Sequence, residues 1–189
     1  MGKLILVLGG ARSGKSTFAQ QLAREHGGQV AFIATAQAGD LEMATRIAAH
    51  QRERPDAWMT LEFPSGVAAA WQEQDIHADL AVLDCLTFLV TNILLEATVD
   101  IDHPDEEKAT RIVAEEIDGL IELVKASPCE WIVVSNEVGF GLVPPYPLGR
   151  LFRDLLGWAN QRLALIADEI FLLVAGIPVP IHPYRTHNP

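Results

Sequence analysis

Eight residues near the start of the chain have the types and spacing of a phosphate-binding loop. They are Gly9, Gly10, Ala11, Arg12, Ser13, Gly14, Lys15 and Ser16, and they match the pattern G-x-x-x-x-G-K-[ST] in full. Glycine lets the backbone curl so that its N–H groups face a phosphate, and the start of a following helix favours negative charge. We predict that Lys15 reaches the β- and γ-phosphates of a nucleoside triphosphate and that Ser16 ligates Mg²⁺.

An acidic residue farther along the chain has the position of a second magnesium ligand. Asp84 closes the apolar run from residue 80 to residue 83, which we expect to be a buried strand. In phosphate-binding loop proteins an acid at the end of such a strand helps to hold Mg²⁺. The same residue also precedes a helical segment, so helix capping is the alternative interpretation.

A histidine lies between two arginines at helical spacing. Arg46, His50 and Arg54 are four residues apart, so on a helix they form one stripe. A packed core histidine is the ordinary interpretation of such a position, and spacing alone does not exclude it. Two fixed cations, however, suit a polyphosphate and disfavour imidazolium, which leaves a neutral ring able to carry a nucleotidyl group as a phosphoramidate. Glu53 or Glu62 would then orient the ring or contact a base.

The elements that must position these groups alternate between short apolar runs and amphipathic segments. We expect strands over residues 3–8, 30–34, 59–63, 80–84, 131–135 and 169–174, with a short edge strand over 179–181. Helices are expected over residues 15–26, 41–54 (capped by Asp40), 65–74, 87–97, 106–126 and 148–167. This pattern predicts an α/β fold, with a mostly parallel sheet and helices on both of its faces. A length of 189 residues fits one domain, residues 1–181, followed by a polar tail, residues 182–189.

Charge and composition narrow the possible partners. The formal net charge of −11 repels nucleic-acid phosphates and anionic headgroups, so we expect no nucleic-acid partner. No apolar run approaches the ~18 residues of a membrane span, and no secretory leader is evident. Cys85 and Cys129 are expected to be buried free thiols. Together these features predict a cytoplasmic protein that is not embedded in a membrane.

The order of several motifs resembles one family along nearly the whole chain. That family is the bifunctional adenosylcobinamide kinase/adenosylcobinamide-phosphate guanylyltransferases. The resemblance rests on residues 9–16, 33–36, 43–55 around His50, 91–92, 135–139 with 143–144, 152–154 and 160–163. A phosphate-binding loop alone would be far less specific than this series.

The resemblance implies a RecA-like P-loop protein with two activities. ATP or GTP first phosphorylates the hydroxyl of adenosylcobinamide, and GMP is then transferred from GTP to that phosphate through a guanylylated histidine at the position of His50. The resemblance also implies a homotrimer. It implies nucleotide contacts at Gly9 to Ser16, Ala34, Thr35, Ala36, Gln51, Arg52, Glu53, Arg54, Glu62 and Asp84.

Two other functions remain compatible with parts of the pattern. A simple P-loop kinase for a small metabolite would explain Gly9 to Ser16 and Asp84 but would leave His50 without a role. A non-catalytic GTP-binding switch would ordinarily carry an Asn-Lys-x-Asp loop, whereas the loop here reads Asn136-Glu137-Val138-Gly139. Asn136 and Glu137 are candidates for contacting the corrinoid or serving the kinase step, and ordinary turn residues are the alternative.

Overall fold

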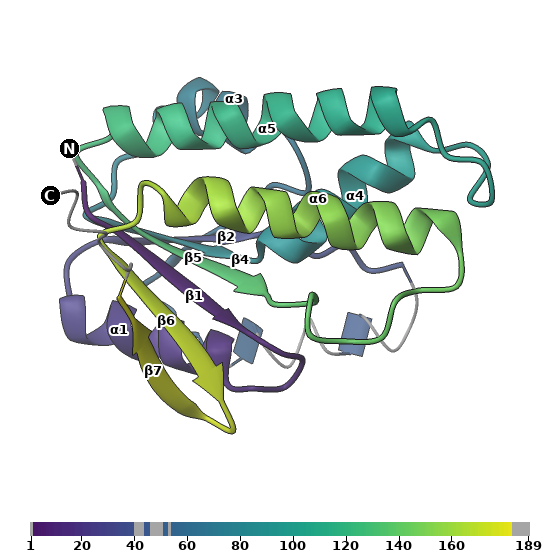
Figure 1. The fold of residues 1–189 in the computed structure, drawn as a ribbon. Helices are drawn as coiled ribbons and strands as arrows, with labels where there is room; N and C mark the ends of the chain where they lie inside the picture. The colour runs from purple at the N-terminus through teal and green to yellow at the C-terminus, as the bar shows by residue number, and fades with distance from the viewer. Residues whose placement is uncertain (1, 40–43, 46–50, 53, 183–189) are drawn as a thin grey trace, which may run out of the picture.

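A single β-sheet organises the chain, and its strands are nearly all parallel. The computed structural model describes residues 2–39, 44–45, 51–52 and 54–182. These residues form a seven-stranded sheet in the order β3-β2-β4-β5-β1-β6-β7, and only the β6–β7 pair is antiparallel (Figure 1). The strands are β1 (Leu4–Gly9), β2 (Val30–Ala34), β3 (Met59–Glu62), β4 (Leu80–Asp84), β5 (Glu130–Asn136), β6 (Glu169–Val174) and β7 (Ile177–Ile181).

The central strands are apolar along their whole length because both of their faces are covered. Every residue of β2 is buried, as are the first four residues of β1 and of β4. By contrast, β3 and β7 lie at the two edges of the sheet and are mostly exposed. This is the expected difference between the interior and the edges of a parallel sheet.

Helices cover both faces of the sheet, but unequally. Helix α1 (Lys15–His26) packs on one face, where Ala19 and Ala23 meet strand residues such as Val7 and Phe32. The opposite face carries α3 (Val67–Glu73), α4 (Leu86–Ala97), α5 (Glu106–Ala126) and α6 (Pro147–Ala164). Figure 1 shows α5 and α6 above the sheet and α1 below it. The predicted α/β architecture is therefore confirmed.

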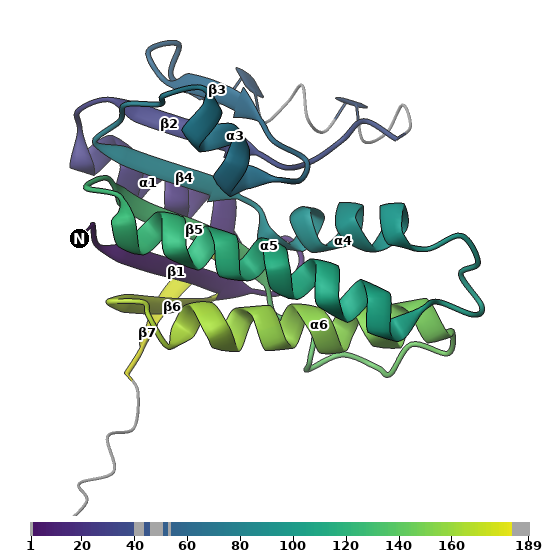
Figure 2. The ribbon, with the colours of Figure 1, turned by 90° about the horizontal axis from the view of Figure 1, so that it is seen from above.

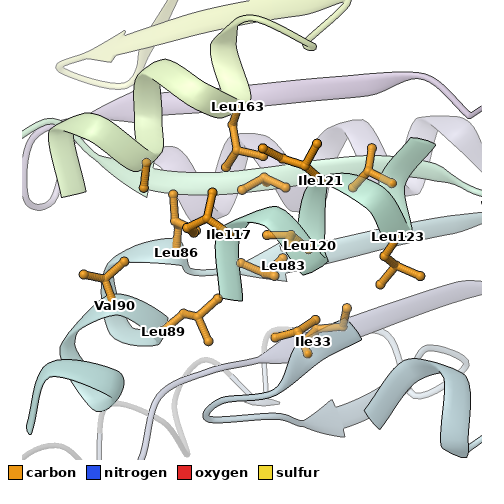
Figure 3. Packing of buried hydrophobic residues seen from close by; sticks show 14 of the residues in the cluster. Ile33, Leu83, Leu86, Leu89, Val90, Ile117, Leu120, Ile121, Leu123 and Leu163 are labelled. Carbon is orange, nitrogen blue, oxygen red and sulfur yellow. The ribbon is translucent and has the colours of Figure 1, made fainter. Parts of the chain in front are cut away.

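The larger of the two cores lies under α4, α5 and α6. Leu86, Leu89 and Val90 of α4 meet Ile117 and the other buried residues of α5, over the strand residues Ile33 and Leu83 (Figure 3). The apolar side chains of α5 recur at helical spacing, and this stripe faces the sheet. The apolar face expected for the helix over residues 106–126 is therefore the face that α5 buries.

The boundaries of several elements differ from the sequence-based expectation. The edge strand β7 begins at Ile177 rather than residue 179, and α6 ends at Ala164 rather than residue 167. Helix α3 begins at Val67, two residues after the expected start. The expected helix 41–54, its cap Asp40, and nearly all of the tail lie outside the described residues, although 44–45 and 51–52 are helical.

The described helices include none that is both long enough and apolar enough to cross a membrane.

Candidate functional site

The parallel register brings the predicted site residues to one edge of the sheet. Gly9 pairs with Asn136, while Ala34 pairs with both Glu62 and Asp84. A cavity of about 430 Å³ opens at these carboxyl ends, which is where open α/β sheets bind their ligands. Its lining residues come from the loop 11–17 and from Ala34, Ala36, Arg54, Glu62, Asp84, Cys85, Phe88, Val134 and Asn136.

Two glycines allow the loop before α1 to take its shape. Gly14 caps α1 with a left-handed φ of 96°, and no side chain among the described residues caps that helix. A Cβ on Gly14 would lie 3.2 Å from Gly176 of the turn between β6 and β7, whose N–H donates to the carbonyl of Ser13. A Cβ on Gly9 would lie 2.6 Å from the Ser13 hydroxyl. The helix therefore presents free backbone N–H groups to the cavity, as anion binding requires.

Lys15 lines the cavity and is held in place by the loop itself. Its side chain lies mostly inside, with 8% of the residue exposed, and Nζ donates to the carbonyl of Gly10 at 2.7 Å. Burial lowers the pKa of Lys15, and the negative charge of Asp84 opposes that shift. A partly desolvated ammonium interacts more strongly with a phosphate than a hydrated one does.

Ser16 and Asp84 reach the same cavity from different elements. Ser16 is the second residue of α1, and Asp84 ends β4. A hydroxyl and a carboxylate are the hard oxygen donors that Mg²⁺ prefers, and Mg²⁺ commonly takes its remaining ligands from water and substrate phosphates. Within the described ranges no cluster of three or more His, Cys, Asp or Glu side chains is present. The donor set thus fits a metal carried in with a nucleotide rather than an all-protein metal cage.

Arg54 also lines the cavity, and part of its guanidinium has no hydrogen-bond partner among the described residues. Its Cζ atom lies 3.8 Å from the centre of the Phe32 ring, a cation–π contact. Nε and Nη1 are buried and find no hydrogen-bond acceptor among the described residues. Burial lowers the pKa of Arg54, while Asp84 and Glu62 act against that shift. Buried unpaired donors beside a cavity are costly unless a ligand accepts from them.

The other predicted nucleotide contacts are distributed unevenly around the cavity. Thr35 is fully buried, and its hydroxyl exchanges hydrogen bonds with the backbone N–H and carbonyl of Cys85 at 2.8 and 2.7 Å. Its side chain therefore joins β2 to the end of β4 instead of lining the cavity. Gln51 and Arg52 are exposed and do not line the cavity either. Gly9 and Gly10 support the loop through their carbonyls.

The predicted nucleophile and two of its neighbours are not placed. His50 and Glu53 lie outside the described residues, as does Arg46. Their relation to the cavity therefore stays a prediction from the sequence.

Four cavity residues were not predicted from the sequence. Thr17 directly follows the loop motif, and Cys85 directly follows Asp84, so their proximity in the chain was an available signal. Phe88 and Val134 reach the cavity only because of how α4 and β5 pack, and no local pattern marks them. Burial raises the pKa of the Cys85 thiol to about 12, so this group is a neutral thiol at pH 7 rather than a nucleophile.

Asn136 enters the cavity from the end of β5 with its backbone held on both sides. Its N–H donates to Oγ1 of Thr87 on α4 at 2.9 Å, and its carbonyl accepts from Nδ2 of Asn160 on α6 at 3.1 Å. The next N–H, that of Glu137, donates to the carbonyl of Gly9 at 3.0 Å. Three elements thus hold this strand end between Asp84 and the phosphate-binding loop.

These features define the class of protein. A phosphate-binding loop between β1 and α1, with an acid at the end of β4, makes this chain a P-loop nucleotide-binding protein. Two solved structures share the fold at 12% identity, and both are ATPases of type III secretion systems. EscN of enteropathogenic E. coli has a TM-score of 0.51, covering 92% of this chain and 43% of that one. A prototypical ATPase from pathogenic bacteria has a TM-score of 0.53, covering 91% of this chain and 51% of that one.

Sequence comparison gives the family within that class. Residues 5–181 match the family described as cobinamide kinase / cobinamide phosphate guanyltransferase, and the chain belongs to this family. The bifunctional adenosylcobalamin biosynthesis protein CobU of Salmonella typhimurium LT2 is 44% identical over 94% of this chain and 99% of its own length. CobU of Escherichia coli K12 is 43% identical, with the same coverage. CobP of Pseudomonas aeruginosa PAO1 is 42% identical, over 93% of this chain and 95% of its own.

Proposed function

We propose that this chain phosphorylates adenosylcobinamide with ATP or GTP and then transfers GMP from GTP to the product, giving adenosyl-GDP-cobinamide and pyrophosphate. The observation that carries the proposal is the family match over residues 5–181, together with a cavity built on Lys15, Ser16 and Asp84. Both reactions occur at phosphorus. An enzyme catalyses such reactions mainly by positioning the reactants and stabilising negative charge.

In the kinase step, residues at the phosphate-binding loop stabilise negative charge on the phosphates. Lys15 and the N–H groups at the start of α1 stabilise charge on the phosphoryl group as it moves from nucleotide to acceptor. Ser16 and Asp84 would hold Mg²⁺, which when bound with the nucleotide neutralises phosphate charge. In this proposal the acceptor hydroxyl approaches beside Asn136, which lines the cavity at the end of β5, the strand between β4 and β1.

In the guanylyl step His50 is the proposed nucleophile. A ring nitrogen attacks the α-phosphorus of GTP, the bond to the β-phosphate oxygen breaks, and pyrophosphate leaves with its charge. An oxygen of adenosylcobinamide phosphate then attacks the same phosphorus, and the P–N bond breaks to free the histidine. Atoms and charges balance without any further reagent.

The remaining predicted contacts serve nucleotide recognition in this proposal. The unpaired Nε and Nη1 of Arg54 would donate to a phosphate or to a base carbonyl. Gln51, Arg52 and Glu53 would contact the nucleotide from the segment that carries His50, and Glu62 from the end of β3. We further propose a cytoplasmic homotrimer, as the family resemblance implies.

The decisive experiment is the intact mass of the protein after incubation with GTP and Mg²⁺. We expect a gain of one GMP that is acid-labile, that needs Lys15, and that is absent from His50→Ala. Adding adenosylcobinamide phosphate should discharge the adduct and yield adenosyl-GDP-cobinamide. Omission of Mg²⁺ should abolish labelling.

The same experiment separates this function from a simple kinase. A folded, GTP-binding protein that forms no adduct, but still phosphorylates cobinamide, would contradict the guanylyl step and remove His50 from the mechanism. Retention of the adduct in His50→Ala would place the nucleophile elsewhere.

A further inference from the structure

The loop between β5 and α6 exposes apolar side chains beside the candidate site. Phe140 and Leu142 are 86% and 96% exposed, and Val143 and Tyr146 are more than half exposed. The stretch 138–146 contains no charged side chain, although the chain as a whole has a net charge of −11. Large apolar groups gathered in one exposed segment commonly mark a ligand or partner surface.

This apolar loop, residues 138–146, is restrained by its own hydrogen bonds. The guanidinium of Arg150 donates to the carbonyls of Pro144 and Pro145 at 3.3 and 2.8 Å. The N–H of Gly139 donates to the carboxylate of Glu137, and that of Gly141 donates to the carbonyl of Val138. The exposed side chains are therefore presented by a loop whose backbone is already partly ordered, which lowers the entropic cost of binding.

The residues just before the apolar loop lie at the cavity. Asn136 lines the cavity, and Glu137 is hydrogen-bonded to Gly9 of the phosphate-binding loop. Phe140 is four residues from Asn136, so its backbone lies within about 13 Å of it even if the chain is fully extended. In Figure 2, α4 and the first turns of α6 extend beyond the carboxyl ends of the strands, and the loop runs along this end.

The size of the cavity places most of the acceptor outside it. A volume of about 430 Å³ lies toward the small end of ligand pockets and suits one nucleotide. A corrinoid is far larger, so only its reacting hydroxyl or phosphate arm would enter while the macrocycle lies on the rim. The macrocycle presents methyl groups and ring edges, which need an apolar surface. Its amide groups are neutral, so they do not need a charged surface.

We propose that the apolar loop is the surface on which the corrinoid macrocycle lies, with Phe140 and Leu142 as its main contacts. This inference rests on the proposed function and adds to it the location of the acceptor. The nucleotide would lie in the cavity, and Asn136 would mark the junction where the arm of the acceptor meets the phosphates.

The test is a comparison of exposed apolar residues near to and far from the site. Phe140→Ser/Leu142→Ser removes the two most exposed apolar groups of the loop, and their exposure makes a folding defect unexpected. Leu165→Ser is the matched control, since Leu165 is 82% exposed at the opposite end of α6. Phe140→Leu keeps an apolar contact. Kinase assays would give KM for adenosylcobinamide and for the nucleotide, and light scattering would give the oligomeric state.

We expect the double variant to raise KM for adenosylcobinamide about tenfold or more, which corresponds to about 1.4 kcal/mol of binding. KM for the nucleotide, kcat at saturating corrinoid and the oligomeric state should stay unchanged, and Leu165→Ser and Phe140→Leu should resemble the wild type. An unchanged corrinoid KM would overturn the inference. So would a change in oligomeric state, because the loop would then contact a second copy. A wild-type chain that binds nucleotide but does not phosphorylate cobinamide would instead refute the proposed function.

Discussion

Two cations that line the cavity, Lys15 and Arg54, are prepared for ligand binding in different ways. Lys15 already donates to a backbone carbonyl of its own loop, so it is oriented before a phosphate arrives. The guanidinium of Arg54 lies over the ring of Phe32, and two of its buried nitrogens, Nε and Nη1, find no acceptor in the part of the chain that the structure describes. Burial lowers the pKa of both groups, and the same burial strengthens their attraction for an anion.

Replacement of Lys15 by methionine should remove catalysis while leaving the fold intact. Methionine fills a similar volume, but it provides no charge near the β- and γ-phosphates. We expect kcat/KM of the kinase step to fall by about 10²- to 10³-fold, the usual cost of losing one preorganised donor. Steady-state kinetics and circular dichroism of Lys15→Met would check this. Near-normal activity in the folded variant would mean that Lys15 does not contact the transferred phosphate.

The two buried thiols predict how stability depends on pH. Burial raises the pKa of Cys85 and of Cys129 to about 12, from an ordinary value of 9.0. Between these values the folded state keeps protons that the unfolded chain releases, so the free energy of unfolding falls as pH rises above about 9. The slope is at most about 1.4 kcal/mol per pH unit for each thiol.

Urea unfolding between about pH 8 and about pH 10.5 would measure this dependence. Cys85→Ala/Cys129→Ala serves as the control, because the alanine side chains do not titrate. We expect the stability of the wild type to decline more steeply than that of the variant. Parallel curves would show that the thiols do not contribute.

At the scale of elements, the end of β5 holds the site together. It lies between β4, which supplies Asp84, and β1, which leads into the phosphate-binding loop. Helices α4 and α6 each provide one side chain that holds the backbone of Asn136. The geometry around Asn136 therefore depends on the packing of two helices as well as on the sheet.

Thr87→Val should weaken this arrangement with almost no change in side-chain shape. The substitution leaves the part-buried N–H of Asn136 without its acceptor, which costs about 1–3 kcal/mol. We expect a lower urea midpoint and a reduced kinase kcat, because Asn136 is less firmly held beside the phosphates. Thr87→Ser keeps the hydroxyl and should behave as the wild type. If valine and serine have the same effect, the hydrogen bond does not stabilise the strand end.

At the scale of the whole molecule, the sheet must end without recruiting further strands. The edge strand β7 pairs Pro178 with Leu173 and Pro180 with Phe171. Proline has no N–H, so it cannot donate to a neighbouring strand. These two positions must therefore be ones at which the backbone N–H of another residue would point outward, away from β6. The outer edge of β7 therefore lacks two donors that an added strand would need, although Ile177, Val179 and Ile181 are exposed.

Pro178→Thr/Pro180→Thr should restore those donors and promote association of the protein through this edge. We expect light scattering to show larger species than the wild type forms at the same concentration. Val179→Thr is the matched control, since it places threonine in the same strand at a position that already has an N–H. Equal association of the double variant and the wild type would show that the prolines do not protect this edge.

The sequence alone determined the features that depend on neighbouring residues or on a repeated pattern. The motif from Gly9 to Ser16 is contiguous, so its loop-and-helix geometry follows from glycine freedom and helix polarity wherever it occurs. The continuous apolar runs predicted a parallel sheet, because only a strand covered on both faces needs such composition. Asp84 was assigned to the site because it ends an apolar strand, where P-loop proteins carry an acidic magnesium ligand.

Only the tertiary structure decided which side chains meet across long separations in the chain. The guanidinium of Arg54 lies on Phe32, Thr87 and Asn160 hold Asn136, and Thr35 turns inward to Cys85 instead of lining the cavity. Each of these contacts depends on strand register and helix packing, which place side chains to within a fraction of an ångström. Residue type and local periodicity predict the elements and their faces, but they do not determine the relative positions of elements that are distant in the chain.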